Sequence, residues 1–266
     1  MKELLWNTVL PDCPWQNTLH RFDAVDSTNT QAKRAAAQGA PHGTVIVADQ
    51  QTGGRGRMGR SFSSPAGMGA YLSVILRPEC PPDALMHLTC AAGLAAHNAV
   101  NRLCGVSADI KWPNDLVVNG KKLGGILTET AFDGHSGLLA YAIVGIGINC
   151  LQKPTDFPDE IRNIATSLFQ LTGTSVDPMA LHTLLTEELY QMDCCLFTDK
   201  VQLMQQYRAA CITPGSTVSV MQADRVCHGT ALYVDDDGGL CVRLTDGTEK
   251  IVTSGEVSIR GMYGYV

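Results

Sequence analysis

The spacing of apolar positions changes near residue 211, which divides the chain into a long first part and a short second part. Polar N-cap residues at 26–29 precede an Ala-rich stretch at 30–38 that ends at Gly39, and this order predicts a short helix. The β-branched run 44–50 predicts a strand that leads directly into a segment rich in glycine and arginine.

The middle of the chain mixes helical and extended patterns. Residues 82–104 are Ala-rich and apolar nearly all round, which predicts a buried helix. Asn119-Gly120 lies between two apolar runs, the strongest short signal for a β-hairpin. The other predicted elements are strands over 70–76, 109–111, 116–118, 121–130 and 138–149, and helices over 178–196 and 200–209.

The second part of the chain reads as a small β-structure. From Thr213 onward, short alternating runs are interrupted by the turn-forming residues 235–239 and 246–247. Four or five short strands at this spacing predict a small β-barrel or roll. We place the domain boundary in the break at 211–215, so the predicted domains are 1–211 and 212–266.

Composition and charge limit the classes of function. The length of 266 residues allows one or two domains, and the net charge of −6 argues against a general nucleic-acid binder. An RNA-binding module is a poor match because the C-terminal segment is rich in aspartate. The ten cysteines form no CxxC pair, the start lacks the apolar core of a secretory signal, and no stretch has the length of a membrane helix. These features predict reduced thiols in a cytoplasmic protein.

The segment 53–60 holds four glycines and three arginines in eight residues. Glycine lets ligand atoms approach the backbone, and the planar guanidinium of arginine matches carboxylate and phosphate oxygens. The segment therefore fits a loop that closes over an anion. Taken alone it fits equally well a solvated basic loop or a weak nucleic-acid tail.

Three later segments also carry chemical groups. Residues 111–115 (Lys-Trp-Pro-Asn-Asp) combine an aromatic ring, an amide and a carboxylate, although Pro-Asn-Asp also suits an ordinary tight turn. Residues 122–126 (Lys-Leu-Gly-Gly-Ile) pair a lysine with strand glycines, which indicate close approach by another group, while the lysine itself also suits a solvated strand edge. Residues 145–149 (Gly-Ile-Gly-Ile-Asn) repeat that pattern.

These segments, with Asp26-Ser27-Thr28-Asn29 and Gln51, occur in the order and spacing of the biotin protein ligase family, which the chain resembles from about Val25 to its end. The resemblance implies an α+β fold: a catalytic domain with a mixed sheet, like that of class II aminoacyl-tRNA synthetases, followed by a small SH3-like β-barrel. About 20 residues precede the motifs, so we expect a monofunctional form without the family's DNA-binding helix-turn-helix.

The resemblance also implies the reaction. Biotin and ATP, with Mg²⁺, give biotinyl-5′-AMP and pyrophosphate, and biotin then passes to a lysine of a biotin carboxyl carrier domain of a biotin-dependent carboxylase. The alternative is a lipoate or octanoyl ligase, which activates a carboxylate in the same way. We expect no nucleic-acid or membrane partner and either a monomer or a homodimer.

Residue roles follow from the matching positions. Arg57, Lys122 and Asp115 are expected to be catalytic, with Asp115 as the base for the acceptor lysine or else only a turn carboxylate. Trp112 and Phe62 are walls of the site or ordinary core residues. The implied biotin contacts are Ser27, Thr28, Asn29, Gln51, Gly54, Arg55, Gly56, Arg57, Lys122 and Gly125. The implied ATP or adenylate contacts are Arg55, Arg57, Arg60, Phe62, Trp112, Asn114, Lys122 and Asn149, with Asn149 also as a Mg²⁺ contact.

Two positions depart from the family pattern. Met58 stands where a basic or aromatic residue is common, and Phe62 stands where many members have tryptophan. Both lie in the Gly/Arg-rich segment and leave its glycines and arginines intact. The glycine content beside like charges predicts that residues 51–62 are mobile without ligand and become ordered when biotin or the adenylate binds.

Overall fold

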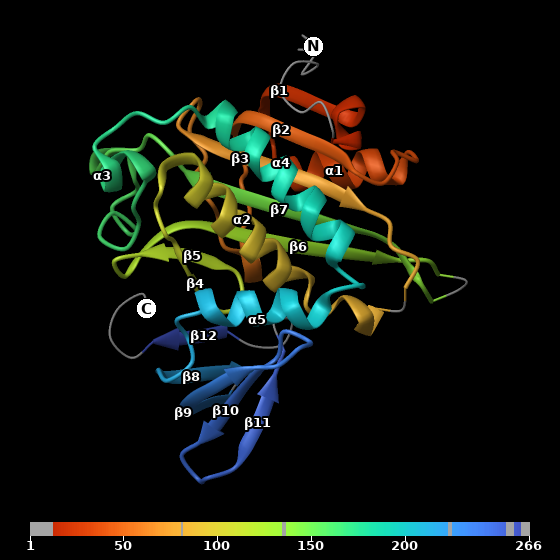
Figure 1. Cartoon of the computed structure of the whole chain (residues 1–266). Coiled ribbons are helices and arrows are strands. Elements are labelled where there is room, and N and C mark those ends of the chain that lie inside the picture. Colours follow the sequence, from red (N-terminus) through yellow and green to blue (C-terminus); the bar gives the residue numbers. More distant parts are fainter. Residues whose placement is uncertain (1–12, 81, 135–136, 223–224, 254–257, 262–266) are drawn as a thin grey trace.

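The structure is a computed structural model that describes residues 13–80, 82–134, 137–222, 225–253 and 258–261. The prediction that the start of the chain lacks a secretory signal concerns residues 1–12, which lie outside the described residues. Parts of the last two strands predicted for the C-terminal β-structure also lie outside them. The described chain forms a seven-stranded mixed sheet in the order β1-β2-β3-β7-β6-β5-β4 and a five-stranded sheet in the order β11-β10-β9-β8-β12 (Figure 1). This arrangement confirms the predicted α+β class and the small C-terminal β-domain.

The strands agree closely with the apolar pattern. Asn119 and Gly120 both have positive φ, 50° and 73°, as a tight hairpin between β5 and β6 requires. The first sheet contains β1 (Leu19–Val25), β2 (Thr44–Gln51), β3 (Gly69–Leu76), β4 (Asp109–Lys111), β5 (Asp115–Val118), β6 (Lys121–Phe132) and β7 (Leu139–Asn149). The second contains β8 (Thr217–Gln222), β9 (Arg225–Val234), β10 (Leu240–Leu244), β11 (Glu249–Val252) and β12 (Ser258–Gly261).

Strand β1 was not predicted. It is an edge strand with partly exposed residues, so its sequence shows neither an apolar run nor a clean alternation. Its pairing partner decides its conformation: β1 runs parallel to β2, with Leu19 opposite Val45. Every other neighbouring pair of the large sheet is antiparallel.

The four predicted helices are present with one correction, and one short helix, α3 (Leu168–Thr172), was not predicted. The predicted helix over 82–104 is instead a short 3₁₀ turn, η3 (Pro82–Leu85), followed by α2 (Leu88–Cys104). The chain turns between them because His87 is fully buried and its Nε2 lies 2.9 Å from the carbonyl oxygen of Leu196. The other helices are α1 (Thr28–Ala37), α3 (Leu168–Thr172), α4 (Pro178–Cys195) and α5 (Lys200–Ala210), with 3₁₀ turns η1 (Pro14–Thr18), η2 (Arg57–Gly59) and η4 (Pro154–Asp156).

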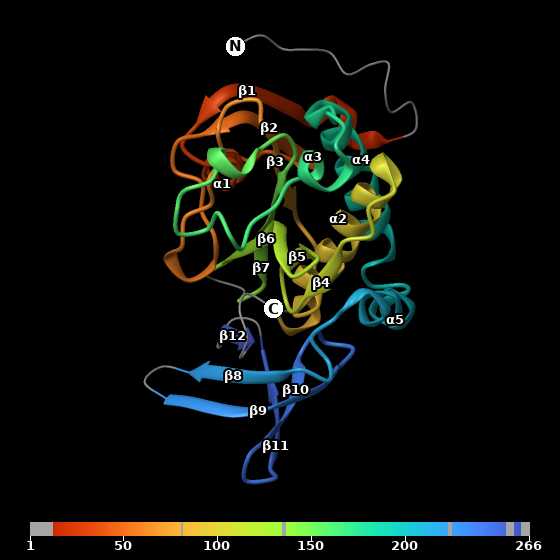
Figure 2. The same cartoon turned by 90° about the vertical axis from the view of Figure 1, so that its left-hand side faces the viewer.

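The large sheet has helices on both faces (Figure 2). On β3, Leu72 and Val74 belong to the main core beneath α2 and α4, whereas Ile75 packs with Ala32 of α1 on the opposite face. Because side chains alternate along a strand, Ser73 also faces α1. Helix α1 has only ten residues. It therefore covers only part of its face, and the Gly/Arg-rich segment covers a neighbouring part.

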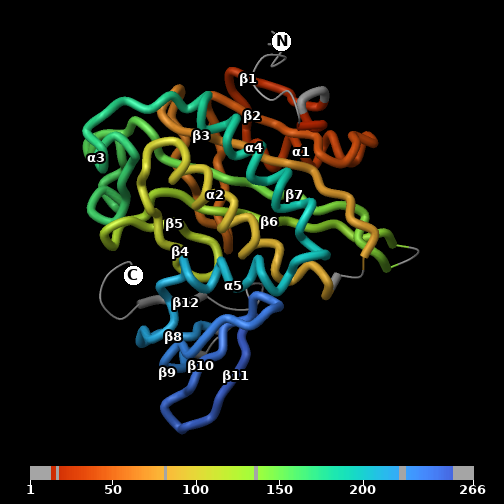
Figure 3. Tube along the Cα trace, in the orientation of Figure 1, coloured from red at the N-terminus to blue at the C-terminus, as the bar shows by residue number. Residues whose placement is uncertain are grey.

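The small sheet follows α5 and lies below it in the trace (Figure 3). The turn between β9 and β10 contacts the first part of the chain through ion pairs, between Asp237 and Lys200 and between Asp236 and Arg208. The indole Nε1 of Trp112 donates a hydrogen bond of 2.8 Å to the carbonyl oxygen of Gly238 in the same turn. The β9–β10 turn of the second sheet thus reaches the 111–115 segment.

Candidate active site

A cavity of about 390 Å³ lies on the α1 face of the large sheet, beneath the Gly/Arg-rich segment. This volume is in the range of small-molecule sites. Its lining comes from segments that are far apart in the sequence. The predicted site residues that line it are Ser27, Thr28, Asn29, Gln51, Arg55, Gly56, Arg57, Arg60, Phe62, Trp112, Asn114, Asp115, Lys122 and Gly125.

Glycines form much of the cavity floor. Register places Gly145 between Ser73 of β3 and Leu127 of β6, and Gly147 lies next along the same face. A Cβ atom on Gly145 would lie 1.9 Å from Oδ1 of Asn29, and one on Gly147 would lie 2.7 Å from Cε1 of Phe62. Both positions need glycine because neighbouring groups occupy the space of a side chain.

One end of the cavity is lined by amide and hydroxyl groups that hold one another. The Oε1 atom of Gln51 accepts hydrogen bonds from the backbone N–H and the hydroxyl of Thr28, at 2.9 and 3.2 Å. The Nε2 atom of Gln51 donates to Ser64 Oγ at 2.8 Å. The Ser73 hydroxyl lies 2.6 Å from Oδ1 of Asn29 and 2.8 Å from Oγ1 of Thr28. These contacts give the donors and acceptors fixed directions.

The other end carries cationic groups. Arg57 Nη1 donates to Asn114 Oδ1 at 3.1 Å, and Lys122 Nζ pairs with Asp115 Oδ1 at 2.6 Å. Burial lowers the pKa of Arg57, an effect that the Asp115 carboxylate opposes. The ordinary pKa of arginine is so high that the guanidinium remains charged at neutral pH. This end of the cavity therefore suits an anionic ligand.

The Gly/Arg-rich segment folds back on itself over the cavity. Gly56 N donates to Arg60 O at 2.7 Å, and Phe62 N donates to Gly54 O at 2.9 Å. Gly54 does not line the cavity; a Cβ there would lie 2.4 Å from Phe62 O, so its role is to permit this turn. Met58 adopts φ 54° at the tip and is 68% exposed, so it borders the cavity from the surface.

Asn149, which is predicted to contact ATP and Mg²⁺, is not among the residues that line the cavity. Its side chain is buried and its Nδ2 donates to the carbonyl oxygen of Thr166 at 2.9 Å. Asn149 therefore holds β7 against the segment that follows it. Among the described residues, no group of three or more His, Cys, Asp or Glu side chains could hold a metal ion.

The two aromatic residues combine both interpretations. Trp112 lines the cavity but is only 2% exposed, and its bond to Gly238 ties it to the second domain. Phe62 lines the cavity above Gly147 and meets Tyr71 edge-on, with 6.4 Å between ring centroids. Both are wall residues of the cavity, and Trp112 also belongs to the buried core.

Sequence reasoning missed several groups around the cavity. Lys111, Leu127 and Ile164 line it, while Ser73 and Glu129 hold residues that line it. One sequence signal for Glu129 was visible: it is a carboxylate that closely follows the glycine-containing apolar run 123–127 of the same strand. Its orientation toward the site depends on the register of β6, which no local pattern gives.

Comparison with known proteins agrees with this geometry. Residues 21–149 match the Biotin/lipoate A/B protein ligase family, and residues 214–260 match the Biotin protein ligase C terminal domain. Over 236 residues the chain is 39% identical to the bifunctional ligase/repressor BirA of Bacillus subtilis, covering 87% of this chain and 71% of that protein. The chain belongs to the biotin protein ligase family.

Two other members of the family are similar to most of this chain. The biotin–[acetyl-CoA-carboxylase] ligase of Paracoccus denitrificans is 33% identical over 242 residues, which cover 89% of this chain and 98% of that one. A solved structure of the Aquifex aeolicus biotin protein ligase with biotin and ATP superposes with a TM-score of 0.76 at 29% identity, covering 92% and 99% of the two chains.

The ten cysteines are free thiols, and half of them are buried. In the described ranges, no helix has both the length and the apolar character needed to cross a bilayer.

Proposed function

We propose that this protein is an ATP-dependent biotin protein ligase. It joins biotin to ATP, forms biotinyl-5′-AMP and pyrophosphate, and transfers biotin to a lysine of a biotin carboxyl carrier domain. One observation carries the proposal: a single cavity has fixed amide and hydroxyl groups at one end and cationic side chains at the other. Biotin has the matching order of groups, with a ureido ring at one end and a carboxylate at the other.

The polar end supplies specificity for the ureido ring. That ring has N–H donors and a carbonyl acceptor, and each loses water when it enters the cavity. An unpaired buried polar group costs about 1–3 kcal/mol, so a binding site for this ring needs fixed partners. Thr28, Asn29 and Gln51 provide them. An octanoyl chain has no polar group for the hydrogen-bonding positions that these side chains still offer to the cavity, which disfavours the lipoate or octanoyl alternative.

The cationic end brings two anions together. The biotin carboxylate attacks the α-phosphate of the MgATP substrate, so a carboxyl–phosphate bond forms while the bond to pyrophosphate breaks. Arg57, Arg60 and Lys122 line this end and offset the charge repulsion between the carboxylate and the phosphates. Mg²⁺ arrives with the triphosphate. The overlying Gly/Arg-rich segment excludes water, which protects the mixed anhydride from hydrolysis.

In the second step the acceptor amine attacks the acyl carbon, an amide bond forms and AMP leaves. The amine must first lose a proton, because only its neutral form attacks. Asp115 Oδ1 is paired with Lys122 Nζ at 2.6 Å. When Lys122 turns to the acyl-phosphate oxygens, Asp115 can accept that proton. The pair therefore links adenylate formation to activation of the acceptor.

The remaining assignments belong to the same proposal. Arg55 and Gly56 cover the carboxylate side, Gly125 lies beneath it, and Trp112 and Asn114 border the nucleotide. We assign the domains to 1–211 and 212–266, since the matched C-terminal model begins at residue 214. The acceptor is a carrier domain of a biotin-dependent carboxylase, the protein acts in the cytoplasm, and it is a monomer or a homodimer.

The experiment is ATP–pyrophosphate exchange with biotin, lipoate or octanoate as the acid. We expect exchange with biotin alone, followed by addition of one biotinyl group to a recombinant carrier domain, measured by mass spectrometry. Lys122→Met should abolish exchange, whereas Lys121→Met, at the exposed neighbouring lysine, should retain it. Exchange supported by lipoate or octanoate instead of biotin overturns the proposal.

A further inference from the structure

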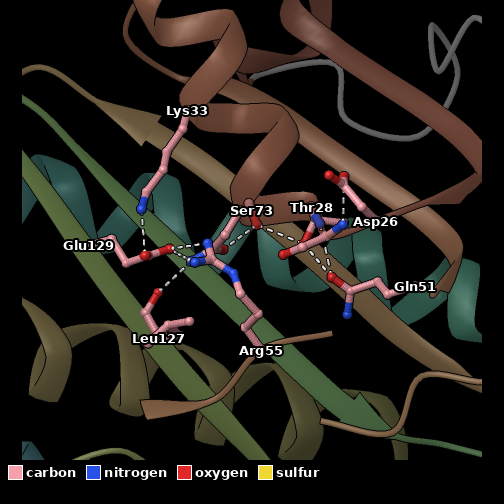
Figure 4. Close-up of polar contacts among 10 residues, drawn as sticks. Asp26, Thr28, Lys33, Gln51, Arg55, Ser73, Leu127 and Glu129 are labelled. Atoms are coloured by element: carbon pink, nitrogen blue, oxygen red, sulfur yellow. Dashed lines mark hydrogen bonds and ion pairs between the residues drawn. The ribbon is translucent and has the colours of Figure 1, made fainter. Parts of the chain in front are cut away.

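Glu129 on β6 collects three donors beside the cavity without lining it. Its Oε2 accepts from Asn29 Nδ2 at 2.8 Å and from Arg55 Nη2 at 2.9 Å, and its Oε1 pairs with Lys33 Nζ at 2.5 Å. Figure 4 shows Arg55 and Lys33 reaching this carboxylate from different segments. Asn29 and Lys33 lie about one turn apart on helix α1, and Arg55 lies in the Gly/Arg-rich segment.

The surroundings of Glu129 favour its charged form. The side chain is 20% exposed, so it lies mostly out of water. Burial raises the pKa of this carboxyl, but hydrogen bonds from Lys33 and Asn29 and the charge of Arg55 outweigh that effect and lower it. An ionised acceptor makes stronger hydrogen bonds than a neutral one.

The carboxylate determines which way the amide of Asn29 points. Asn29 Nδ2 donates both to Glu129 and to the carbonyl oxygen of Leu127, at 3.1 Å for the latter. With both N–H groups engaged, Oδ1 must face Ser73 and the cavity floor at Gly145. Without an acceptor at Glu129, the amide loses the stronger, charged one of the two contacts that oppose the flipped orientation.

The same carboxylate ties the Gly/Arg-rich segment to the sheet. Arg55 forms a bridge with Ser61 at the base of the folded-back segment. The glycines on both sides of Arg55 give this backbone wide conformational freedom. A side-chain contact of Arg55 therefore restricts the segment more than the same contact would restrict a stiff segment. Arg55 itself lines the cavity.

We propose that Glu129 is a positioning residue for the biotin site. Its carboxylate orients Asn29 and holds Arg55 over the cavity before substrate arrives. The inference rests on the proposed function for its ligand, biotin, and adds a residue that acts only through its partners. Preorganised contacts raise affinity by reducing what must be ordered on binding. The effect therefore falls on biotin binding rather than on the chemical step.

The first test is steady-state kinetics of Glu129→Gln, which keeps a carbonyl acceptor but removes the charge. We expect the KM for biotin to rise about tenfold, with kcat and the KM for ATP within about twofold of wild type. Glu188→Gln is the matched control, since Glu188 is 14% exposed and pairs with Arg102 at 2.6 Å, remote from the cavity. It should leave all three constants unchanged.

Arg55→Met tests the Arg55–Glu129 ion pair from the side of its more exposed partner. Because the Arg55 side chain is 42% exposed, we expect its replacement to have little effect on folding. We expect it to raise the KM for biotin as well, and the double variant with Glu129→Gln to add less than about twofold, because the two residues act as a unit. An unchanged KM for biotin in Glu129→Gln, or equal changes in the KM for ATP, overturns the proposal.

A second readout needs no catalysis. Limited trypsin digestion of the ligand-free protein, followed by mass spectrometry, measures cleavage after Arg55. We expect cleavage there to be at least about threefold faster in Glu129→Gln than in wild type and Glu188→Gln. Equal rates count against the anchor. If the wild-type protein shows no biotin-dependent exchange, the proposed function fails, while this comparison still decides whether Glu129 holds Arg55.

Discussion

Replacing Gly145 with alanine should disrupt the polar end of the cavity by a defined route. The new Cβ would lie 1.9 Å from Oδ1 and 2.8 Å from Cγ of Asn29, distances that no pair of nonbonded atoms tolerates. Gly145 is in the middle of the sheet, paired with Ser73 and Leu127, so its backbone has little room to move. The side chain of Asn29 must therefore leave its position.

The magnitude follows from the hydrogen bonds that hold Asn29. Its amide contacts Leu127 O at 3.1 Å, Ser73 Oγ at 2.6 Å and the carboxylate of Glu129 at 2.8 Å. Neutral bonds contribute about 1 kcal/mol each and a bond to a charged group about 2, so losing all three lowers the free energy of unfolding by about 4 kcal/mol. Partial retention in a shifted position gives about 2 kcal/mol.

Urea unfolding measures this loss, and titration calorimetry measures biotin affinity, which should fall at least about tenfold because Asn29 lines the cavity. Gly134→Ala is the control, since a Cβ there meets no atom within 4 Å. In an Asn29→Ala background the clashing atoms are gone, so Gly145→Ala should cost less than about 1 kcal/mol. The reasoning is refuted if Gly145→Ala costs the same in both backgrounds or no more than Gly134→Ala.

Three further outcomes are expected. Arg57→Gly removes the half-buried guanidinium that contacts Asn114 at the cationic end of the cavity, so the adenylate should escape and label bystander proteins. A streptavidin blot with excess albumin detects this labelling, and strictly acceptor-specific labelling contradicts the prediction. Burial lowers the pKa of His182 to about 4, and its Nε2 accepts a hydrogen bond from the backbone N–H of Tyr71. As the pH falls below about 6.5, His182 therefore becomes protonated in the unfolded chain but stays neutral in the folded protein. The free energy of unfolding keeps the full contribution of His182 above that pH and falls by up to about 3 kcal/mol as the pH drops towards 4. Urea unfolding at several pH values should show this slope, reduced in His182→Gln; an equal slope in the variant rules His182 out as its source. Biotin with ATP should slow tryptic cleavage after Arg57 and Arg60, as expected if residues 51–62 become ordered on binding, and unaltered cleavage opposes that idea.

The elements of this fold were largely predictable because their signals are local. A run of β-branched residues predicted β2, Asn119-Gly120 predicted the β5–β6 hairpin, and the caps around residues 26–39 predicted α1. Strand β1 escaped because its conformation comes from pairing with β2 and not from its own residues. The predicted start of α2 was wrong for a similar reason, since the turn before α2 depends on the contact of buried His87 with Leu196, far along the chain.

The candidate site was predictable only as a list of residues. The motifs supplied the amides, arginines and lysine, and the resemblance added Asn149, whose buried amide donates to Thr166 and does not line the cavity. It also could not show Glu129, which matches no motif quoted for the family. Whether a strand residue faces a ligand or a neighbour depends on which strands lie beside it.

The amino-acid sequence by itself determined the order of the elements, the supply of chemical groups and the family. Tertiary structure decided which of those groups meet. Ser73, Gly145 and Leu127 lie side by side only because β3, β7 and β6 pair in one register, and a shift of one residue would turn each to the opposite face. Strand pairing joins residues distant in sequence, so no local pattern encodes the cavity floor or the carboxylate of Glu129 beside it.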